Sequence, residues 1–413
     1  MAADRLAILA AYAGALLTRA RLRSRADIEA LQAARWARQA RVLKRAPAYA
    51  AKAGRPISHF PVVDASAARA DFAARNTLGL DLDTALAAAE AAETGAEAIL
   101  PGGVTAGLST GTSGARGVFL ASPAERARYL GEALARLLPG PIWKPWRIAL
   151  VLRADSALYR DVEQAGRFRF AFHGLDEHPS ERAAGLQAFD PHVLIAPAHV
   201  LRTLEAARLP SLRRLLAGAE PMSGAEAIWL RDRLGVWPEP IYQATEGFLG
   251  SPCPLGGVHL HEDMLVFERQ SVPGAPDAFQ PIITDLVRRS QPAVRLRLDD
   301  VLEELSSPCA CGSPFTSVRV HGRVGDVWRI GDLTLLPGQV EDALEEVLPF
   351  GADWAAVLDV EGVEIVCADF EGAGPAAAAA LRTLAGRPLP IRLREAPPVQ
   401  GGPKRRRVRN LTT

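Results

Sequence analysis

Apolar residues recur at three- and four-residue spacings through residues 1–53, a segment rich in Ala, Arg and Leu. This spacing predicts one or two amphipathic helices that end near Gly54-Arg55-Pro56. The apolar run 6–17 is too short to span a hydrocarbon core of about 30 Å, and arginines follow it at once. We expect this helix to pack against the rest of the fold, and the alternative is that it lies flat on a membrane surface.

From about residue 100 onward, short apolar runs alternate with helical stretches. The runs 148–152 and 193–196 are typical of buried strands, whereas 124–138 and 226–234 have the spacing of helices. Strands and helices in alternation favour an α/β fold built of layered sheets and helices.

Past Gly322 the pattern restarts on a smaller scale. It predicts a helix at 340–347, strands at 354–358 and 363–368, and an Ala-rich helix near 376–384. Roughly 90 residues are enough for a small α+β domain. We therefore expect a large domain at 1–322, including the helical segment 1–53, and a small mobile C-terminal domain at 323–413.

Composition and charge limit the classes of function. Hydrophobic residues make up 48% and charged residues 23% of the 413, which is typical of a globular protein. A formal net charge of +1 creates no overall field for nucleic acid, and the basic run 404–409 lacks interleaved aromatics, so no nucleic-acid partner is expected. Four cysteines are too few for a disulfide scaffold and favour a cytoplasmic location.

The segment Ser109-Thr110-Gly111-Thr112-Ser113-Gly114-Ala115-Arg116-Gly117 carries three glycines and four hydroxyl groups. Glycines let the backbone turn its N–H groups toward phosphate oxygens, and hydroxyls and Arg116 can add donors and charge. A P-loop NTPase is disfavoured because the Gly-Lys-Ser/Thr ending is absent. Taken alone, the segment also fits an ordinary surface turn.

Five further segments follow in order, and with the loop they cover residues 109–408. They are Gly218-Ala219-Glu220-Pro221, Tyr242-Gln243-Ala244-Thr245-Glu246, Arg295-Leu296-Arg297-Leu298-Asp299-Asp300, Gly322-Arg323-Val324-Gly325-Asp326 and Gly402-Pro403-Lys404-Arg405-Arg406-Arg407-Val408. In this order they resemble the motifs of the adenylate-forming superfamily of acyl-CoA synthetases and adenylation domains.

Within that superfamily the chain most resembles the phenylacetate-CoA ligase branch. The Cys-x-Cys-Gly segment at 309–312 and the segment Gly257-Val258-His259-Leu260-His261-Glu262-Asp263 have counterparts there. The loop form Ser-Thr-Gly-Thr-Ser-Gly-x-Arg-Gly is similar to that of a poorly characterised clade of adenylate-forming enzymes in this branch.

The resemblance implies a nucleotide site. In acyl adenylation a carboxylate oxygen attacks the α-phosphorus of ATP while pyrophosphate leaves, so the protein must position both reactants and neutralise phosphate charge. Glu246 would bind Mg²⁺, Thr245 would contact the α-phosphate, and Tyr242 would stack on adenine. The remaining nucleotide contacts would come from Ser109, Thr110, Gly111, Thr112, Ser113, Gly114, Arg116, Gly218, Ala219, Glu220, Gln243, Asp300 and Arg323, with Asp300 on the ribose hydroxyls.

Lys404 would bridge the substrate carboxylate and the α-phosphate when the small domain closes about a hinge at Asp326. The alternatives are a surface role for Glu246, a turn role for Asp300 and a solvated tail for Lys404. Two positions depart from the superfamily pattern: Leu298-Asp299 replaces Thr-Gly, and Pro403 replaces the glycine before Lys404. Either change could weaken catalysis.

Cys253, His259, Cys309 and Cys311 lie on short Gly/Pro-rich segments. Three thiolates and an imidazole are ligands that a tetrahedral structural Zn²⁺ accepts. The alternatives are four side chains that hold no metal, or His261 as the imidazole.

We therefore expect an ATP-dependent ligase that adenylates a small carboxylic acid and transfers the acyl group to a thiol, either CoA or the phosphopantetheine of an acyl carrier protein. The resemblance favours an aryl or arylalkyl acid. Two alternative functions stay open: acyl or adenylyl transfer to a non-thiol acceptor, and a nucleotide-binding scaffold without turnover. A homodimer also stays open. The acid pocket could be lined by Phe168, Phe170, Phe172, His173 and Phe248, although each also fits the core.

Overall fold

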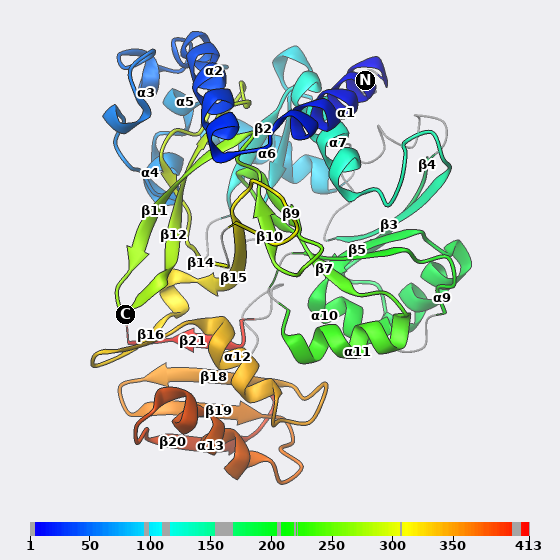
Figure 1. Ribbon diagram of the computed structural model, residues 1–413, viewed down its shortest axis with the longest axis vertical. Coiled ribbons are helices and arrows are strands. Elements are labelled where there is room, and N and C mark those ends of the chain that lie inside the picture. Colours follow the sequence, from blue (N-terminus) through cyan, green and yellow to red (C-terminus); the bar gives the residue numbers. More distant parts are fainter. Residues whose placement is uncertain are drawn as a thin grey trace.

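The structure is a computed structural model that describes residues 5–94, 99–109, 116–152, 168–204, 208–218, 220, 222–305, 308–398 and 406–412. These residues form five sheets with helices packed around them (Figure 1). The predicted layered α/β fold is confirmed.

The N-terminal segment forms three helices rather than one or two: α1 (Arg5–Arg21), α2 (Arg25–Leu43) and the short α3 (Pro47–Ala50). Ser24 separates the first two, because its side chain accepts a hydrogen bond from the backbone of Asp27 and caps α2. α1 packs against α7 (Pro123–Leu137), as expected from the sequence. A Cβ at Gly131 of α7 would lie 2.5 Å from the Cβ of Ala11, so the glycine permits the close approach of the two helices.

A five-stranded parallel sheet has the order β4-β3-β5-β6-β7. Its strands are β3 (Trp146–Leu152), β4 (Phe168–Gly174), β5 (Val193–Pro197), β6 (Arg214–Gly218) and β7 (Pro238–Pro240). The helices that follow them are α9 (Pro179–Phe189), α10 (Ala198–Leu201) with η3 (Arg202–Leu204), and α11 (Gly224–Leu234). The carboxyl ends of parallel strands meet at one edge of the sheet, which is where such folds bind ligands.

An eight-stranded antiparallel sheet lies beside it, in the order β11-β12-β14-β15-β10-β9-β8 with β13 against β12. Its strands are β8 (Tyr242–Ala244), β9 (Gly247–Pro252), β10 (Val258–Leu260), β11 (Leu265–Val272), β12 (Ala275–Asp285), β13 (Leu296–Arg297), β14 (Asp300–Glu304) and β15 (Ser317–Arg323). The register of β14 and β15 sets Asp300 directly opposite Arg323, so two predicted site residues meet through strand pairing.

Shorter elements connect these layers. They are η1 (Ile57–His59), α4 (Ala65–Ala70), α5 (Phe72–Arg75), α6 (Leu82–Glu93), η2 (Pro101–Gly103) and the hairpin β1 (Thr105–Leu108) and β2 (Val118–Ala121). The segment 109–117 joins β1 to β2, and its residues 110–115 lie outside the described part of the chain.

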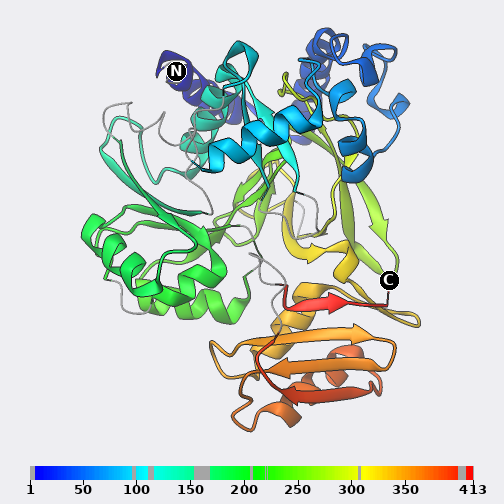
Figure 2. The ribbon, with the colours of Figure 1, turned by 180° about the vertical axis from the view of Figure 1, so that it is seen from behind.

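The C-terminal part follows η4 (Val324–Asp326) and forms a separate α+β layer (Figure 2). It consists of the hairpin β16 (Trp328–Ile330) and β17 (Leu333–Leu335), the helices α12 (Pro337–Glu345) and α13 (Gly374–Ala385), and the sheet β20 (Ile391–Glu395), β19 (Gly362–Cys367), β18 (Trp354–Asp359) and β21 (Val408–Asn410). These elements match the predicted helices and strands, and they enclose their own core around Trp328, Leu344 and Ile365. A domain division at residue 322 stays a prediction.

No helix in the described part of the chain is both long and apolar enough to cross a membrane.

Candidate active site

A cleft of about 1270 Å³ lies where the two large sheets meet the C-terminal part. Every motif segment contributes at least one described residue to its wall. The site residues that line it are Ser109, Arg116, Gly218, Glu220, Tyr242, Gln243, Thr245, Glu246, Asp300, Arg323 and Asp326. Thr110, Gly111, Thr112, Ser113, Gly114, Ala219 and Lys404 lie outside the described residues.

Two hydrogen bonds join the two ends of the loop 109–117. The N–H of Ser109 donates to the carbonyl of Gly117, and the N–H of Gly117 donates to the Ser109 hydroxyl, both at 2.8 Å. A Cβ at Gly117 would lie 3.2 Å from the methyl group and 3.3 Å from the hydroxyl of Thr245. The glycine therefore lets the loop base approach Thr245, the residue expected to contact the α-phosphate.

Arg116 clamps this loop to α6. Both terminal nitrogens of its guanidinium donate to the Glu93 carboxylate, one of them at 2.7 Å, and Nε donates to the Ser109 carbonyl at 2.9 Å. The arginine lines the cleft, but the Glu93 ion pair already engages its charge. The sequence predicted that this charge would serve phosphate directly, and no motif identified Glu93, which lies 23 residues away.

Asp300 lies between Tyr242 and Arg323. The Tyr242 hydroxyl donates to the Asp300 carboxylate at 2.8 Å, and Arg323 Nε lies 3.4 Å from the other carboxylate oxygen. Burial raises the pKa of Tyr242 well above its usual value, and the negative charge of Asp300 adds to this effect. The tyrosine is thus a permanent hydrogen-bond donor that orients the carboxylate in the cleft.

Glu246 is a partly buried carboxylate on the cleft wall. Burial raises its pKa, and the charge of Asp300 acts in the same direction, opposed by Arg288 and Arg323. Arg288 donates to the backbone carbonyl of Glu246 at 3.0 Å. A carboxylate whose ionised form is penalised in this way gains from a cation beside it, so its donor chemistry fits Mg²⁺.

Glu220 and Glu341 both line the cleft. Glu220 accepts hydrogen bonds from the backbone N–H of His199 at 2.6 Å and lies 2.7 Å from its ring nitrogen Nδ1. Burial and the charge of Glu220 raise the pKa of Glu341, on α12, to about 8. Sequence analysis did not single out Glu341, because no motif covers α12.

Two sets of ion pairs involve Arg406 and Arg407, and the second set joins the C-terminal part to the rest of the protein. Arg406 pairs through two nitrogens with Asp326, the predicted hinge residue, and its Nε donates at 3.1 Å. The second set, here called the latch cluster, consists of Arg202, Ser223, Glu226, Glu345 and Arg407.

Within the latch cluster, Arg407 lies 3.2 Å from Glu226 of α11 and also pairs with Glu345 of α12. Arg202 contacts the same two carboxylates, and the Ser223 hydroxyl donates to Glu345. Arg407 and Glu226 are buried, with 6% and 3% exposed. The partners come from four separate segments, so no local sequence pattern could have identified them.

The cleft extends into an apolar arm between α7 and the parallel sheet. Tyr129, Ala133 and Leu137 of α7 face Ile148 and Ile195 of the sheet. Of the five aromatic candidates for the acid pocket, Phe170 alone belongs to the described wall of the cleft.

The other four candidates lie outside the described wall of the cleft. The sequence had favoured core packing over an acid-pocket role for each of them. Phe168 and Phe172 pack in the core under α7, and His173 contacts Glu177 at 2.8 Å. Phe248 packs edge-on against His261, with ring centroids 4.4 Å apart.

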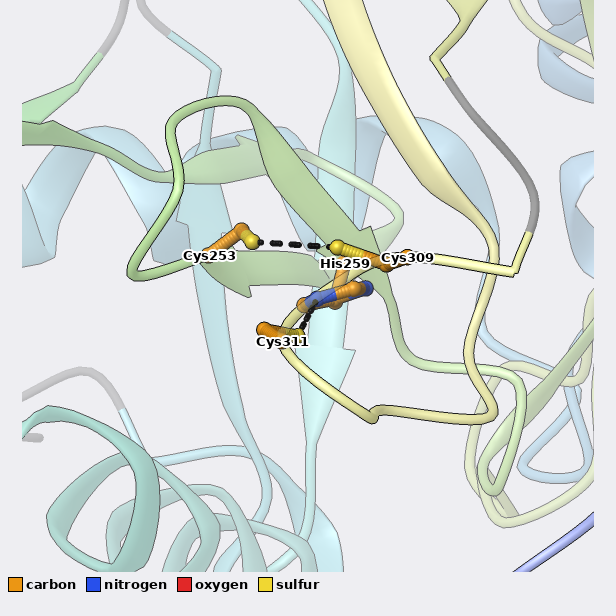
Figure 3. Close-up of side chains that lie close together, drawn as sticks. All are labelled: Cys253, His259, Cys309 and Cys311. Atoms are coloured by element: carbon orange, nitrogen blue, oxygen red, sulfur yellow. Dashed lines mark hydrogen bonds between the residues drawn. The ribbon is translucent and has the colours of Figure 1, made fainter.

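Cys253, His259, Cys309 and Cys311 come together as the sequence predicted (Figure 3). Their ligand atoms all lie within 4.8 Å of one another. The sulfur atoms of Cys253 and Cys309 are 3.6 Å apart, and Nε2 of His259 is 3.1 Å from the sulfur of Cys311. Tetrahedral Zn²⁺ with Zn–S bonds of about 2.3 Å needs sulfurs about 3.8 Å apart, so these residues fit the metal.

Backbone contacts orient the side chains of this cluster. Nδ1 of His259 lies 3.1 Å from the Phe315 carbonyl, which directs Nε2 toward the thiols. His261, the alternative imidazole, lies outside the cluster, and its Nδ1 is 2.9 Å from the Phe248 carbonyl. The neighbouring Glu262 accepts from the backbone N–H of Thr316 at 2.7 Å and pairs with Arg25, so it fixes the same loops to α2.

No protein-family model and no curated protein matches the sequence. Solved structures do match. A 2-hydroxyisobutyryl-CoA ligase, in the postadenylation state in complex with 2-HIB-AMP, has a TM-score of 0.67 and 16% identity over 94% of this chain and 90% of that chain. The same ligase in its thioesterification state, with CoA, has a TM-score of 0.52 over 92% and 89%.

Two further enzymes match over less of the chain. The anthranilate CoA ligase AuaEII in complex with anthranoyl-AMP has a TM-score of 0.55 and 12% identity over 73% of this chain and 66% of that chain. The amide bond synthetase McbA from Marinactinospora thermotolerans has a TM-score of 0.53 and 16% identity over 73% and 68%. The chain therefore has the fold of adenylate-forming enzymes, as its motifs predicted.

Proposed function

We propose that this protein is an ATP-dependent ligase that activates a carboxylic acid as an acyl-adenylate and passes the acyl group to a thiol. One observation carries the proposal. Motif segments from residue 109 to residue 408 contribute to one cleft, although they belong to separate layers of the fold. Packing of the hydrophobic core alone does not require these particular segments to line one cleft.

In the first half-reaction, a carboxylate oxygen of the acid forms a bond to the α-phosphorus of ATP, and the bond from that phosphorus to pyrophosphate breaks. Asp300, held by Tyr242 and Arg323, would accept hydrogen bonds from the ribose hydroxyls. Ser109, at the base of the loop, and Thr245, which lies beside it, would flank the phosphates. Lys404 would bridge the carboxylate and the α-phosphate.

Mg²⁺, held by Glu246, would neutralise charge on the phosphates. A cation beside Glu246 would favour the ionised carboxylate and so oppose the effect of burial on the pKa of Glu246. Zn²⁺ on the three thiols and His259 would be structural, because all four positions are protein ligands.

In the second half-reaction, the sulfur of a thiol attacks the acyl carbon and AMP leaves with the former carboxylate oxygen. CoA or the phosphopantetheine of an acyl carrier protein is the proposed acceptor. The similarity to the CoA ligases supports a thiol. An amine is the second candidate acceptor, because the amide bond synthetase shares the fold.

The apolar arm supports an acid whose acyl part is uncharged, such as an aryl or arylalkyl acid. Its described walls carry aliphatic and aromatic side chains, including Ile148, Ile195 and Phe170, and none of these could neutralise a second charge on the substrate. The matched AuaEII structure carries an anthranoyl group, which is an aryl acyl group.

The test is acid-dependent release of pyrophosphate from ATP and Mg²⁺ across a panel of aromatic and aliphatic acids, with and without CoA. The proposal predicts release with one group of acids, and loss of that release in Lys404→Ala and Glu246→Ala. Release that needs an amine instead of CoA would favour the second acceptor. If no acid of the panel supports pyrophosphate release although calorimetry shows that ATP binds, the result would favour a nucleotide-binding scaffold.

A further inference from the structure

The outward side of α1 is apolar. On the inward side, Ile8 and Ala15 are buried against the neighbouring α7, with 3% and 2% exposed. On the outward side, Leu9, Leu16 and Leu17 are 48%, 41% and 57% exposed. Between Arg5 and Arg19, each residue of α1 that is exposed is apolar, and these are Leu6, Leu9, Ala10, Ala13, Gly14, Leu16 and Leu17.

These leucines form one continuous stripe. At 3.6 residues per turn, Leu9, Leu16 and Leu17 project within about 100° of each other around the helix axis. Figure 1 shows α1 at the edge of the molecule, beside α7. An exposed helix side normally carries polar residues, so a side made of leucine, alanine and glycine points to a surface that is covered in use.

Arginine dominates the charged residues of this segment, although Asp4 and Asp27 flank it in the sequence. Residues 5–26 contain five arginines and no acidic residue, although the whole chain has a formal net charge of only +1. Arg19 donates to the carbonyl of Ala135, and Arg25 pairs with Glu262. Arg5, Arg21 and Arg23 are exposed at the two ends of the stripe.

We propose that α1 is an interfacial helix that binds the surface of an anionic lipid bilayer. The leucine stripe would enter the boundary between headgroups and acyl chains, and the flanking arginines would lie at the lipid phosphates. A helix of 17 residues is about 25 Å long and lies along the surface in this arrangement.

A second copy of the chain is the competing occupant of the stripe. In an antiparallel pair of α1 helices, Arg5 of each would approach Arg21 of the other, and α1 carries no acidic residue to compensate. A parallel pair would place like arginines side by side. The anionic bilayer complements the same charges, which is why we favour it.

The test is cosedimentation of the full chain with vesicles of phosphatidylcholine, alone or mixed with phosphatidylserine. The wild type should bind vesicles that contain phosphatidylserine at least tenfold more tightly than vesicles of phosphatidylcholine alone, since each arginine near an anionic surface increases affinity about fivefold. Added salt should weaken this binding because it screens the charges. The variant Leu9→Gln/Leu16→Gln/Leu17→Gln should lose at least tenfold in affinity. Glutamine keeps the helix propensity, so pyrophosphate release and the melting temperature should not change.

The control is Val360→Gln/Leu411→Gln, which alters two exposed apolar residues of the C-terminal part, 91% and 63% exposed, and should bind like the wild type. Equal binding by the α1 variant and the wild type would overturn the proposal, as would the absence of binding to anionic vesicles. A wild-type dimer in light scattering that the α1 variant cannot form would assign the stripe to a second copy instead.

Discussion

The hydroxyl of Tyr242 donates a 2.8 Å hydrogen bond to the carboxylate of Asp300, 58 residues further along the chain. Tyr242 begins β8 at one edge of the antiparallel sheet, and Asp300 begins β14 of the same sheet. The bond shows that the residue expected to stack on adenine also orients the residue expected to hold the ribose. The two roles are therefore coupled.

Tyr242→Phe keeps the ring and removes this donor. We expect the free energy of unfolding to fall by about 1–2 kcal/mol, because a hydrogen bond from a buried donor to a carboxylate is lost. We also expect KM for ATP to rise more than kcat falls. Urea denaturation and steady-state kinetics measure both, and an unchanged unfolding free energy with unchanged KM would contradict the coupling.

The pair Glu341 and Glu220 predicts a pH dependence. The folded pKa of Glu341, about 8, lies above its ordinary value of 4.5, mainly through burial and then through the charge of Glu220. The folded state therefore holds a proton that the unfolded chain has lost, and stability should decline as pH rises from about 4.5 to about 8. Asp342 adds to the shift, and Arg202 and Arg319 oppose it.

Glu341→Gln removes this titration. At pH 8 the variant should be more stable than the wild type by roughly 1–3 kcal/mol, less than the full shift would give because the side chain stays partly exposed. Near pH 4.5 the two should be equally stable. Thermal unfolding across this pH range measures the stability of both proteins. The account would be contradicted if stability changed with pH in the same way in the wild type and the variant.

The cysteine and histidine cluster predicts one bound zinc ion per chain. Cys309→Ala should abolish zinc in elemental analysis and lower the melting temperature, because two loops lose their common anchor. Cys367→Ala is the matched control, since Cys367 is a buried cysteine in the C-terminal part, outside the cluster. Full zinc content in Cys309→Ala would refute the assignment of this ligand.

The latch cluster predicts that the C-terminal part is held in place by charge. Arg407→Ala leaves the buried carboxylates of Glu226 and Glu345 with Arg202 as their partner in the cluster. Removing one member of a buried ion pair costs about 3–5 kcal/mol when the charge left behind has no partner, and the cost here should be smaller because Arg202 still contacts both carboxylates. We expect the C-terminal part to detach, which small-angle scattering would detect as a larger radius of gyration, together with a lower rate of pyrophosphate release.

Arg392→Ala tests the specificity of this effect. Arg392 pairs with Asp359 and Glu361 within the C-terminal part, so its removal should leave the radius of gyration unchanged. An equal expansion in both variants would mean that the latch cluster has no special role.

Local patterns predicted the layers, and the motifs predicted a part of the cleft wall. Strand and helix periodicity identified segments such as 148–152 and 226–234, and the motifs named Asp300 and Arg323, which strand pairing then sets opposite each other. The sequence also predicted the four residues of the metal cluster, because thiols and imidazole on short loops have few other uses.

Contacts between distant segments could not be predicted. The partner of Arg116 proved to be Glu93, and Arg407 and Glu345 are 62 positions apart without a motif around the glutamate. Phe168 and Phe170 share one face of β4, as their spacing of two requires, yet of these two only Phe170 belongs to the described wall of the cleft. Which of them meets the cavity depends on where α7 crosses the sheet.

The central claim is that a carboxylate oxygen attacks the α-phosphorus of ATP in this cleft. The most direct measurement uses an acid that supports pyrophosphate release, labelled with ¹⁸O in its carboxylate, and mass spectrometry of the nucleotide after complete turnover to the thioester. The account predicts AMP that carries one ¹⁸O atom and pyrophosphate that carries none. ADP as the product, with ¹⁸O in inorganic phosphate, would show attack at the γ-phosphorus and would contradict it.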